Sequence, residues 1–120
     1  MREFLPITKA LSDETRLRLL MALRQEELCL CQLVDLLQLA PSTVSKHMAL
    51  LHQAGFVERR KEGRWHFYRL AKERVPQAAE QALAWVIDSL ADEPMIREDE
   101  GRLAEILRMD LEELSRCYRS

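Results

Sequence analysis

The chain has 120 residues, 48% of them hydrophobic and 32% charged, as is typical of a single folded domain. It has no apolar run of the ~18 residues that a membrane-spanning helix needs and no signal-peptide pattern at its start, which excludes a membrane span and secretion and predicts a cytoplasmic protein. The net charge of −2 conceals a basic region, because residues 40–72 carry 7 Lys and Arg against 2 Asp and Glu, whereas residues 73–120 carry 6 against 12.

The first half of the chain is patterned as helices. We expect them over residues 7–11, 12–25, 28–39 and 40–55. Ser12 and Asp13 form a typical N-cap, and Gly55 suits the left-handed position that ends a helix. Pro41 stops the third helix, and Ser42 can cap the fourth. The buried side of the third helix is predicted to carry Leu33, Leu36 and Leu37.

The second half begins with a change of period. Residues 56–70 are rich in aromatic and β-branched residues around Glu62-Gly63-Arg64, which predicts a β-hairpin. A long helix follows over 73–91, then a linker at 92–94 and one last helix over 98–118. We therefore divide the chain into a main domain, 1–91, and an acidic C-terminal linker and helix, 92–120.

The helix expected over 40–55 has the character of a DNA recognition helix. Val44, Met48 and Leu51 share its apolar side, while small, polar and basic residues share the other. Such a surface fits a major groove ~12 Å wide. A solvent-exposed surface helix is the plain alternative. His47 lies at the edge of the apolar side, where a flanking histidine that is already hydrogen-bonded is the simpler interpretation.

The hairpin adds a basic tip beside this helix. We interpret Arg60, Lys61 and Arg64 as phosphate contacts, although Glu58 and Glu62 partly neutralise the tip. Helix, turn, helix and hairpin in this order predict a mainly α winged helix-turn-helix fold. The candidate DNA-binding residues are Ser42, Thr43, Ser45, Lys46, His47, Gln53, Arg60, Lys61 and Arg64.

The long helix over 73–91 is apolar on more sides than a small domain can cover. This surplus predicts a partner helix from a second copy, and hence a dimer formed through terminal helices. A two-fold dimer places two recognition helices about one DNA turn, ~34 Å, apart on a palindromic double-stranded operator.

With these motifs the chain resembles the ArsR/SmtB family of metal-responsive transcriptional repressors. The resemblance spans residues 8–90 and rests on "ALSDETRLRLLMAL", "ELCLCQLVDLL", "APSTVSKHMALLHQAGFVERRKEGRWHFYRL" and the long helix. It implies a homodimeric repressor that leaves its operator when an effector binds.

The arsenic-sensing branch of that family carries a Cys-x-Cys-x-x-Cys pattern before the recognition helix. Cys29 and Cys31 match its first two positions, but Val34 occupies the third. As(III) or Sb(III) is thus the expected effector, and Cys117 is a candidate third ligand because the pattern lacks its third thiol. It shares one helix side with Leu103, Leu107, Leu111 and Leu114. The family's zinc site looks absent, since no histidine follows His66.

On a regular helix Cys29 and Cys31 point ~200° apart. We therefore expect an ion bound to both to unwind the first turn of their helix and so to disturb the recognition helix. An odd number of cysteines in a reducing compartment argues against a disulfide framework.

Other interpretations stay open at this stage. The two cysteines can be buried small hydrophobes, or part of a thiol redox switch in which a bond between Cys29 and Cys31 is strained within a helix and one to Cys117 is not. The chain can also be an effector-independent repressor or a dimerising adaptor. An enzyme is not expected, because the sequence has no glycine-rich phosphate loop or paired-carboxylate pocket.

Overall fold

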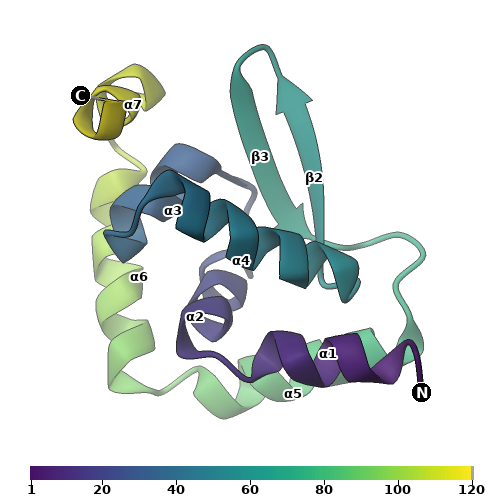
Figure 1. Cartoon of the computed structure of the whole chain (residues 1–120). Helices are drawn as coiled ribbons and strands as arrows, with labels where there is room; N and C mark the ends of the chain where they lie inside the picture. Colours follow the sequence, from purple (N-terminus) through teal and green to yellow (C-terminus); the bar gives the residue numbers. More distant parts are fainter. Residues whose placement is uncertain (120) are drawn as a thin grey trace.

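The computed structural model describes the backbone of residues 1–119 and the side chains of residues 1–115. The elements are α1 (Phe4–Leu11), α2 (Glu14–Ala22), β1 (Leu28–Cys29), α3 (Leu30–Leu37), α4 (Pro41–Gln53), β2 (Val57–Glu62), β3 (Trp65–Leu70), α5 (Gln77–Leu90), α6 (Pro94–Ile106) and α7 (Leu111–Arg119). The three strands form one antiparallel sheet in the order β1-β3-β2. Figure 1 shows the β2–β3 hairpin projecting from the helices beside α4. The predicted mainly helical fold with a hairpin wing is confirmed.

The main core lies where α1 to α5 meet the base of the sheet. The apolar side of α4 is fully buried there, as its period predicts, at Val44, Met48 and Leu51. The Asp13 carboxylate caps α2 by accepting a hydrogen bond from the Arg16 amide at 3.1 Å. Gly55 has a φ of +89°, and a side chain there would meet Pro76 at 3.0 Å. The turn after α4 therefore needs glycine for its conformation and for space.

Two predicted helix starts were wrong. Ser42 does not cap α4, because the helix begins at Pro41 with Ala40 as N-cap. Proline suits this first position, since it lacks the amide that a cap would satisfy. The third helix begins at Leu30 and not at Leu28, because Leu28 and Cys29 pair with Tyr68 and Phe67 of β3. Strand pairing thus takes two residues that the period assigned to the helix.

The last part of the chain folds as two helices where the sequence predicted one over 98–118. Pro94, predicted as linker, begins α6, and the chain turns after Ile106 before α7. The expected common apolar side is broken as a result: Leu107 is 42% exposed, whereas Leu114 is 1% exposed.

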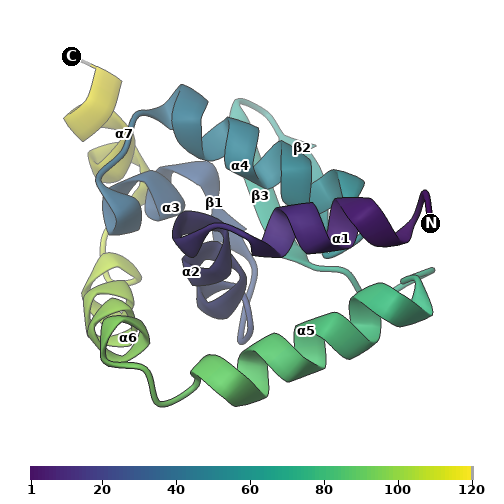
Figure 2. The ribbon, with the colours of Figure 1, turned by 60° about the horizontal axis from the view of Figure 1, so that its bottom comes forward.

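Helix α6 is fixed to the body of the molecule, as Figure 2 shows, where it runs beside α2 and α3. Arg18 of α2 donates two hydrogen bonds, of 2.8 and 2.9 Å, to the buried carboxylate of Asp99. Helix α7 in turn packs on α3. Within the described residues, no helix is long and apolar enough to cross a bilayer.

Candidate DNA interface and thiol pair

The outward side of α4 presents short polar and basic groups. Ser42, Thr43, Lys46 and Gln53 are exposed, and Ser45 is half-buried. The buried face of α4 holds these groups outward on a rigid helix. Such a surface can approach base edges and phosphates, and all of these residues were candidates from the sequence.

An open groove of about 410 Å³ separates α4 from the hairpin. Its lining includes Ser45 of α4 and Arg59, Lys61, His66 and Tyr68 of the hairpin. Arg59 pairs with Tyr68 and Lys61 with His66 across the two strands, and paired side chains lie on the same face of a sheet. Lys61 therefore lies on the face of the hairpin that borders α4. Arg59 and His66 were missed, although strand alternation from Lys61 points to both.

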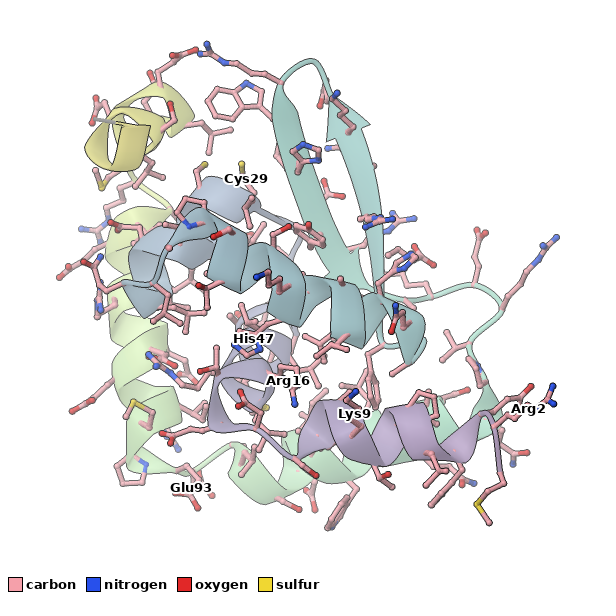
Figure 3. All side chains as sticks on the ribbon, viewed as in Figure 1. Arg2, Lys9, Arg16, Cys29, His47 and Glu93 are labelled. Carbon is pink, nitrogen blue, oxygen red and sulfur yellow. The ribbon has the colours of Figure 1, made fainter. Side chains whose placement is uncertain are left out.

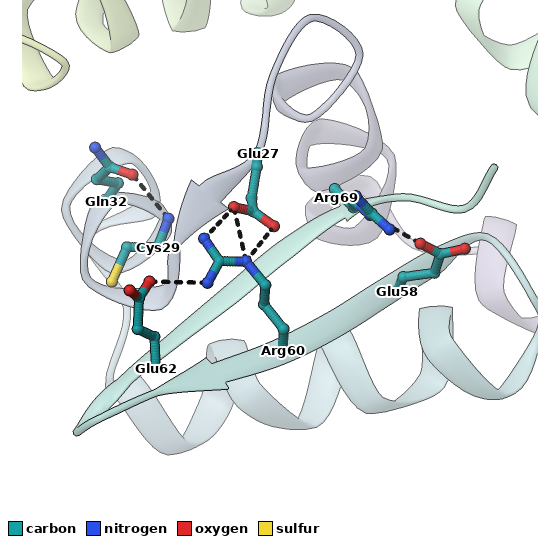
Figure 4. Close-up of polar contacts among 7 residues, drawn as sticks. All are labelled: Glu27, Cys29, Gln32, Glu58, Arg60, Glu62 and Arg69. Carbon is teal, nitrogen blue, oxygen red and sulfur yellow. Dashed lines mark hydrogen bonds and ion pairs between the residues drawn. The ribbon is translucent and has the colours of Figure 1, made fainter. Parts of the chain in front are cut away.

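Arg60 also borders this groove, but its guanidinium lies on the opposite face of the hairpin. It donates to the Glu27 carboxylate at 2.7 Å and to Glu62 at 2.8 Å (Figure 4). It also lies 4.4 Å from the centre of the Phe67 ring. The hydrogen bonds from Arg60 hold the pKa of Glu27 below its usual value. The charge of Arg60 is thus already matched within the protein.

Arg64, at the tip of the hairpin, contacts the last helix. Its guanidinium forms an ion pair with Glu112 in the first turn of α7 and lies 4.7 Å from the centre of the Trp65 ring. The predicted phosphate contact at the tip is therefore held by an acidic side chain from a distant part of the sequence.

His47 is held by a buried arginine. Arg16 donates to the carbonyls of Ala10 and Lys9 at 2.8 and 3.0 Å, and its Nη1 lies 3.1 Å from His47 Nδ1 (Figure 3). Because a guanidinium only donates, Nδ1 must accept, and the proton of the neutral ring lies on Nε2. His47 is therefore a half-buried residue whose ring orientation is fixed by the guanidinium of Arg16 in α2.

Cys29 and Cys31 form a close pair at the junction of β1 and α3. Cys29 is the N-cap of α3 with extended backbone angles of φ −75° and ψ 151°, and Cys31 lies in the first turn. The two sulfurs lie 2.9 Å apart. The expected divergence of about 200° was wrong, because Cys29 lies outside the helix. Gln32 secures this geometry by accepting a hydrogen bond from the Cys29 amide at 2.7 Å.

The thiol pair is buried beneath a small apolar cluster that is separate from the main core. Cys29 and Cys31 are 2% and 1% exposed, and they pack with Leu36, Ile106 and Leu114. The same cluster is completed by Ala22, Trp65, Phe67 and Leu111. Its cover thus comes from the hairpin and from the two C-terminal helices.

The two thiols differ in acidity. The Cys31 thiol donates to Cys29 Sγ, and the amides of Cys31, Gln32 and His66 also favour the Cys29 thiolate, which lowers the pKa of Cys29 to about 7 despite burial. The same bond and burial raise the pKa of Cys31. One thiolate beside one retained thiol is the expected state near neutral pH.

A third soft ligand is not seen among the described side chains. Val34, which stands where the arsenic-sensing pattern has its third cysteine, is buried in the main core. The backbone of Cys117 lies in α7, and its side chain lies outside the described residues. Residues 1–115 contain no group of three or more His, Cys, Asp or Glu side chains that could hold a metal ion.

Comparisons with known proteins show that the chain is similar to bacterial regulatory proteins. Residues 13–59 match the family described as "Bacterial regulatory protein, arsR family". The chain is 42% identical over 110 residues to the arsenic resistance transcriptional regulator ArsR1 of Pseudomonas putida, covering 88% of this chain and 84% of the relative. It is 42% identical over 64 residues to the arsenical resistance operon repressor of Escherichia coli, covering 52% and 55%.

Solved structures show the same fold. HlyU from Vibrio cholerae superposes with a TM-score of 0.63 at 27% identity, covering 76% of this chain and 95% of HlyU. The family and the two relatives from Pseudomonas putida and Escherichia coli are named as regulators or repressors and not as enzymes. With its winged helix-turn-helix fold and its similarity over most of the length of an arsenic resistance regulator, this chain belongs to the ArsR family of DNA-binding transcriptional repressors.

Proposed function

We propose that this protein is a cytoplasmic homodimeric repressor that a soft metalloid, As(III) or Sb(III), releases from its operator by binding to Cys29 and Cys31. The observation that carries the proposal is the buried pair of sulfurs 2.9 Å apart. Two metal–sulfur bonds of ~2.3 Å at an angle near 100° hold their sulfurs about 3.5 Å apart, so the pair has to open only slightly for one ion to bind both.

The chemistry of the pair fits an arsenite ligand. Thiolates prefer soft centres, and Cys29 is the more acidic thiol. Arsenous acid, As(OH)₃, exchanges one hydroxide for each thiolate, and the hydroxide leaves as water with the proton of the thiol. Two cysteines complete two such exchanges. The proposal assigns the third to Cys117, from either subunit.

The thiol pair has a direct route to the DNA-binding elements. Cys29 pairs with Phe67 of the wing, and α3 packs against α4. A ligand that moves Cys29 therefore moves a strand of the wing and the support of the recognition helix. A coupling free energy of ~1–3 kcal/mol corresponds to a loss of DNA affinity from about fivefold to over a hundredfold.

The proposed dimer uses α1 and α5, which pack against each other in the subunit. Phe4 and Leu5 of α1 are 53% and 57% exposed, and Trp85 of α5 is 69% exposed. Large apolar side chains at this exposure support burial against a second copy. Two copies then present two recognition helices to a palindromic operator.

The proposed DNA contacts are the residues on α4 and the wing. Exposure on the outward side of α4 supports Ser42, Thr43, Lys46 and Gln53. The groove supports Ser45 and Lys61 and adds Arg59 and His66. Arg60, Arg64 and His47 stay predictions, and each first has to share or leave an internal partner.

A thiol redox switch is the second candidate. A disulfide needs its sulfurs ~2.05 Å apart, and Cys29 lies outside the helix that was expected to strain such a bond. Hydrogen peroxide can take two electrons from the two thiols, which leaves one disulfide and two molecules of water. The 2.9 Å separation favours this reaction as well as metalloid binding.

Fluorescence anisotropy on a duplex from the promoter of the protein's own gene tests these functions. Under reducing conditions we expect arsenite to release the DNA and zinc to leave it bound. Release by peroxide but not by arsenite contradicts the metalloid proposal and favours the redox switch. Binding that no addition disturbs leaves an effector-independent repressor.

A further inference from the structure

The last helix contacts both the thiol pair and the tip of the wing. Leu111 and Leu114 of α7 pack in the apolar cluster that covers Cys29 and Cys31. Glu112, in the same first turn, forms an ion pair with Arg64 at the hairpin tip. One short helix therefore joins the buried sulfurs to a cation of the wing that was predicted to contact phosphate.

The aromatic side chain beside Arg64 reinforces this connection. Arg64 lies 4.7 Å from the centre of the Trp65 ring, and Trp65 itself packs against the cluster around the thiols. The position of Arg64 is thus set by two neighbours, and both lie against the cover of the thiol pair. Moving α7 changes the surroundings of Arg64 and of the sulfurs together.

We propose that Glu112 competes with a DNA phosphate for Arg64, so that α7 acts as an intramolecular brake on operator binding. The proposal rests on the function proposed above, in which the wing contacts DNA. Glu112 accepts from one nitrogen of the Arg64 guanidinium, Nη2. A phosphate that binds the guanidinium through two N–H groups, one of them on Nη2, must displace the carboxylate.

The exposure of the pair suits a reversible competition. The side chains of Arg64 and Glu112 are 46% and 50% exposed, so solvent screens their attraction and a phosphate can replace the carboxylate at small cost. A closely spaced row of phosphates on DNA is a stronger anion than one carboxylate. The brake therefore lowers the affinity for DNA without preventing binding.

The direction of the brake agrees with effector-driven release. A ligand that holds α7 more firmly against the thiol pair keeps Glu112 beside Arg64 and so opposes DNA binding. Conversely, DNA that takes Arg64 from Glu112 weakens one of the contacts that hold α7 over the thiols. Because binding free energies are reciprocal, each event must disfavour the other.

The test is a double-mutant comparison on the promoter duplex, using the full chain without arsenite. Glu112→Gln keeps the size of the side chain and removes its charge. Glu105→Gln is the matched control, since it removes the same charge from an exposed site on α6. We expect Glu112→Gln to bind about twofold to fivefold more tightly than Glu105→Gln, and Arg64→Ala to abolish that difference.

The possible outcomes separate a failure of the proposed function from a failure of the brake. Failure of the wild type to bind the duplex overturns the proposed function, and the brake with it, in the first titration. Normal binding with equal affinities for Glu112→Gln and Glu105→Gln overturns the brake alone, as does a gain that persists with Arg64→Ala. Thiol reactivity in a Cys117→Ser background separates loss of the ion pair from detachment of α7. The rate for Glu112→Gln should stay well below that of Leu114→Ala, which removes a side chain packed against the thiols, and equal rates for the two variants overturn the brake.

Discussion

The two faces of the β2–β3 hairpin have the same strands but opposite surroundings. One face opens into the groove beside α4 and presents Arg59, Lys61 and His66. The other face lies against the thiol pair, with Phe67 in the apolar cluster and Arg60 paired with two carboxylates. Arg59 and Arg60 are neighbours in sequence, yet one faces the proposed DNA and the other is neutralised by the protein. The difference shows that the face of the strand on which a cationic side chain lies decides whether that side chain is available to a DNA phosphate.

This two-sided hairpin also explains how a buried site can affect a surface. In the proposed mechanism a change at Cys29 reaches the thiol face through the β1–β3 pairing, and the groove face belongs to the same strands. A ligand therefore needs no long chain of contacts to reach the DNA side. The four predictions below test the separation of the two faces, beginning with the largest effect.

Leu114→Ala should damage the thiol face most. The side chain is 1% exposed within the small cluster, so its removal leaves a cavity that we expect to weaken the packing of α7 by about 2–4 kcal/mol. Denaturant titration and the rate of thiol modification measure this. Leu107→Ala, at a side chain that is 42% exposed, is the control and should change the free energy of unfolding by less than about 1 kcal/mol. Equal effects of the two variants contradict the packing described for α7.

Cys29→Ala and Cys31→Ala should each abolish release by arsenite while operator binding is kept. Each removes one of two close sulfurs, so the coupling of ~1–3 kcal/mol between effector and DNA is lost. Anisotropy titrations with and without arsenite measure the change. Cys117→Ser, measured in parallel, shows whether a third thiolate takes part. If arsenite still releases DNA from either alanine variant, the metalloid site does not lie at this thiol pair.

The acidity of Cys29 should depend on the hydrogen bond from Cys31. Cys31→Ala removes the donor that contributes most to the lowered pKa, so the pKa should rise from about 7 toward ~8.5. The thiolate then forms only at higher pH, and reaction with an electrophile near pH 7 should slow by roughly tenfold or more. Cys31→Ser keeps a hydroxyl donor and should shift the pKa less. Ultraviolet titration of the thiolate in a Cys117→Ser background measures both variants, and a Cys29 pKa that stays near 7 in both assigns its acidity to the backbone amides.

Arg59→Ala and Arg60→Ala should separate the two faces directly, with the smallest effect of the four. Loss of a phosphate contact at Arg59 should cost about 1 kcal/mol, roughly fivefold in affinity, and lower the salt dependence by about one counterion. Arg60→Ala should lower the DNA affinity and its salt dependence less, because Glu27 and Glu62 already occupy its guanidinium. DNA affinities of the two variants, measured over a range of salt concentrations, test this. A larger loss of affinity for Arg60→Ala than for Arg59→Ala reverses the assignment of the faces.

Local patterns in the sequence were sufficient for much of the fold. The apolar period placed Val44, Met48 and Leu51 in the core, the Asp13 cap began α2, and glycine with a positive φ followed α4 and formed the hairpin turn. These features depend on residues close in sequence, where hydrophobic period and backbone preference act alone. The basic character of α4 and the wing was equally visible.

Contacts between distant residues decided the rest. Pairing of β1 with β3 drew Cys29 out of the helix and brought its sulfur to Cys31, and α7 folded back so that Glu112 met Arg64. The period of a helix cannot reveal a strand partner 38 residues away, as Cys29 and Phe67 are, nor can a run of charges reveal which arginine meets a carboxylate. By itself the sequence determined which residue types are candidates for the chemistry, because residue type and spacing are local properties. Only the tertiary structure decided which of them meet, because strand pairing and helix docking are fixed by burial across the whole chain.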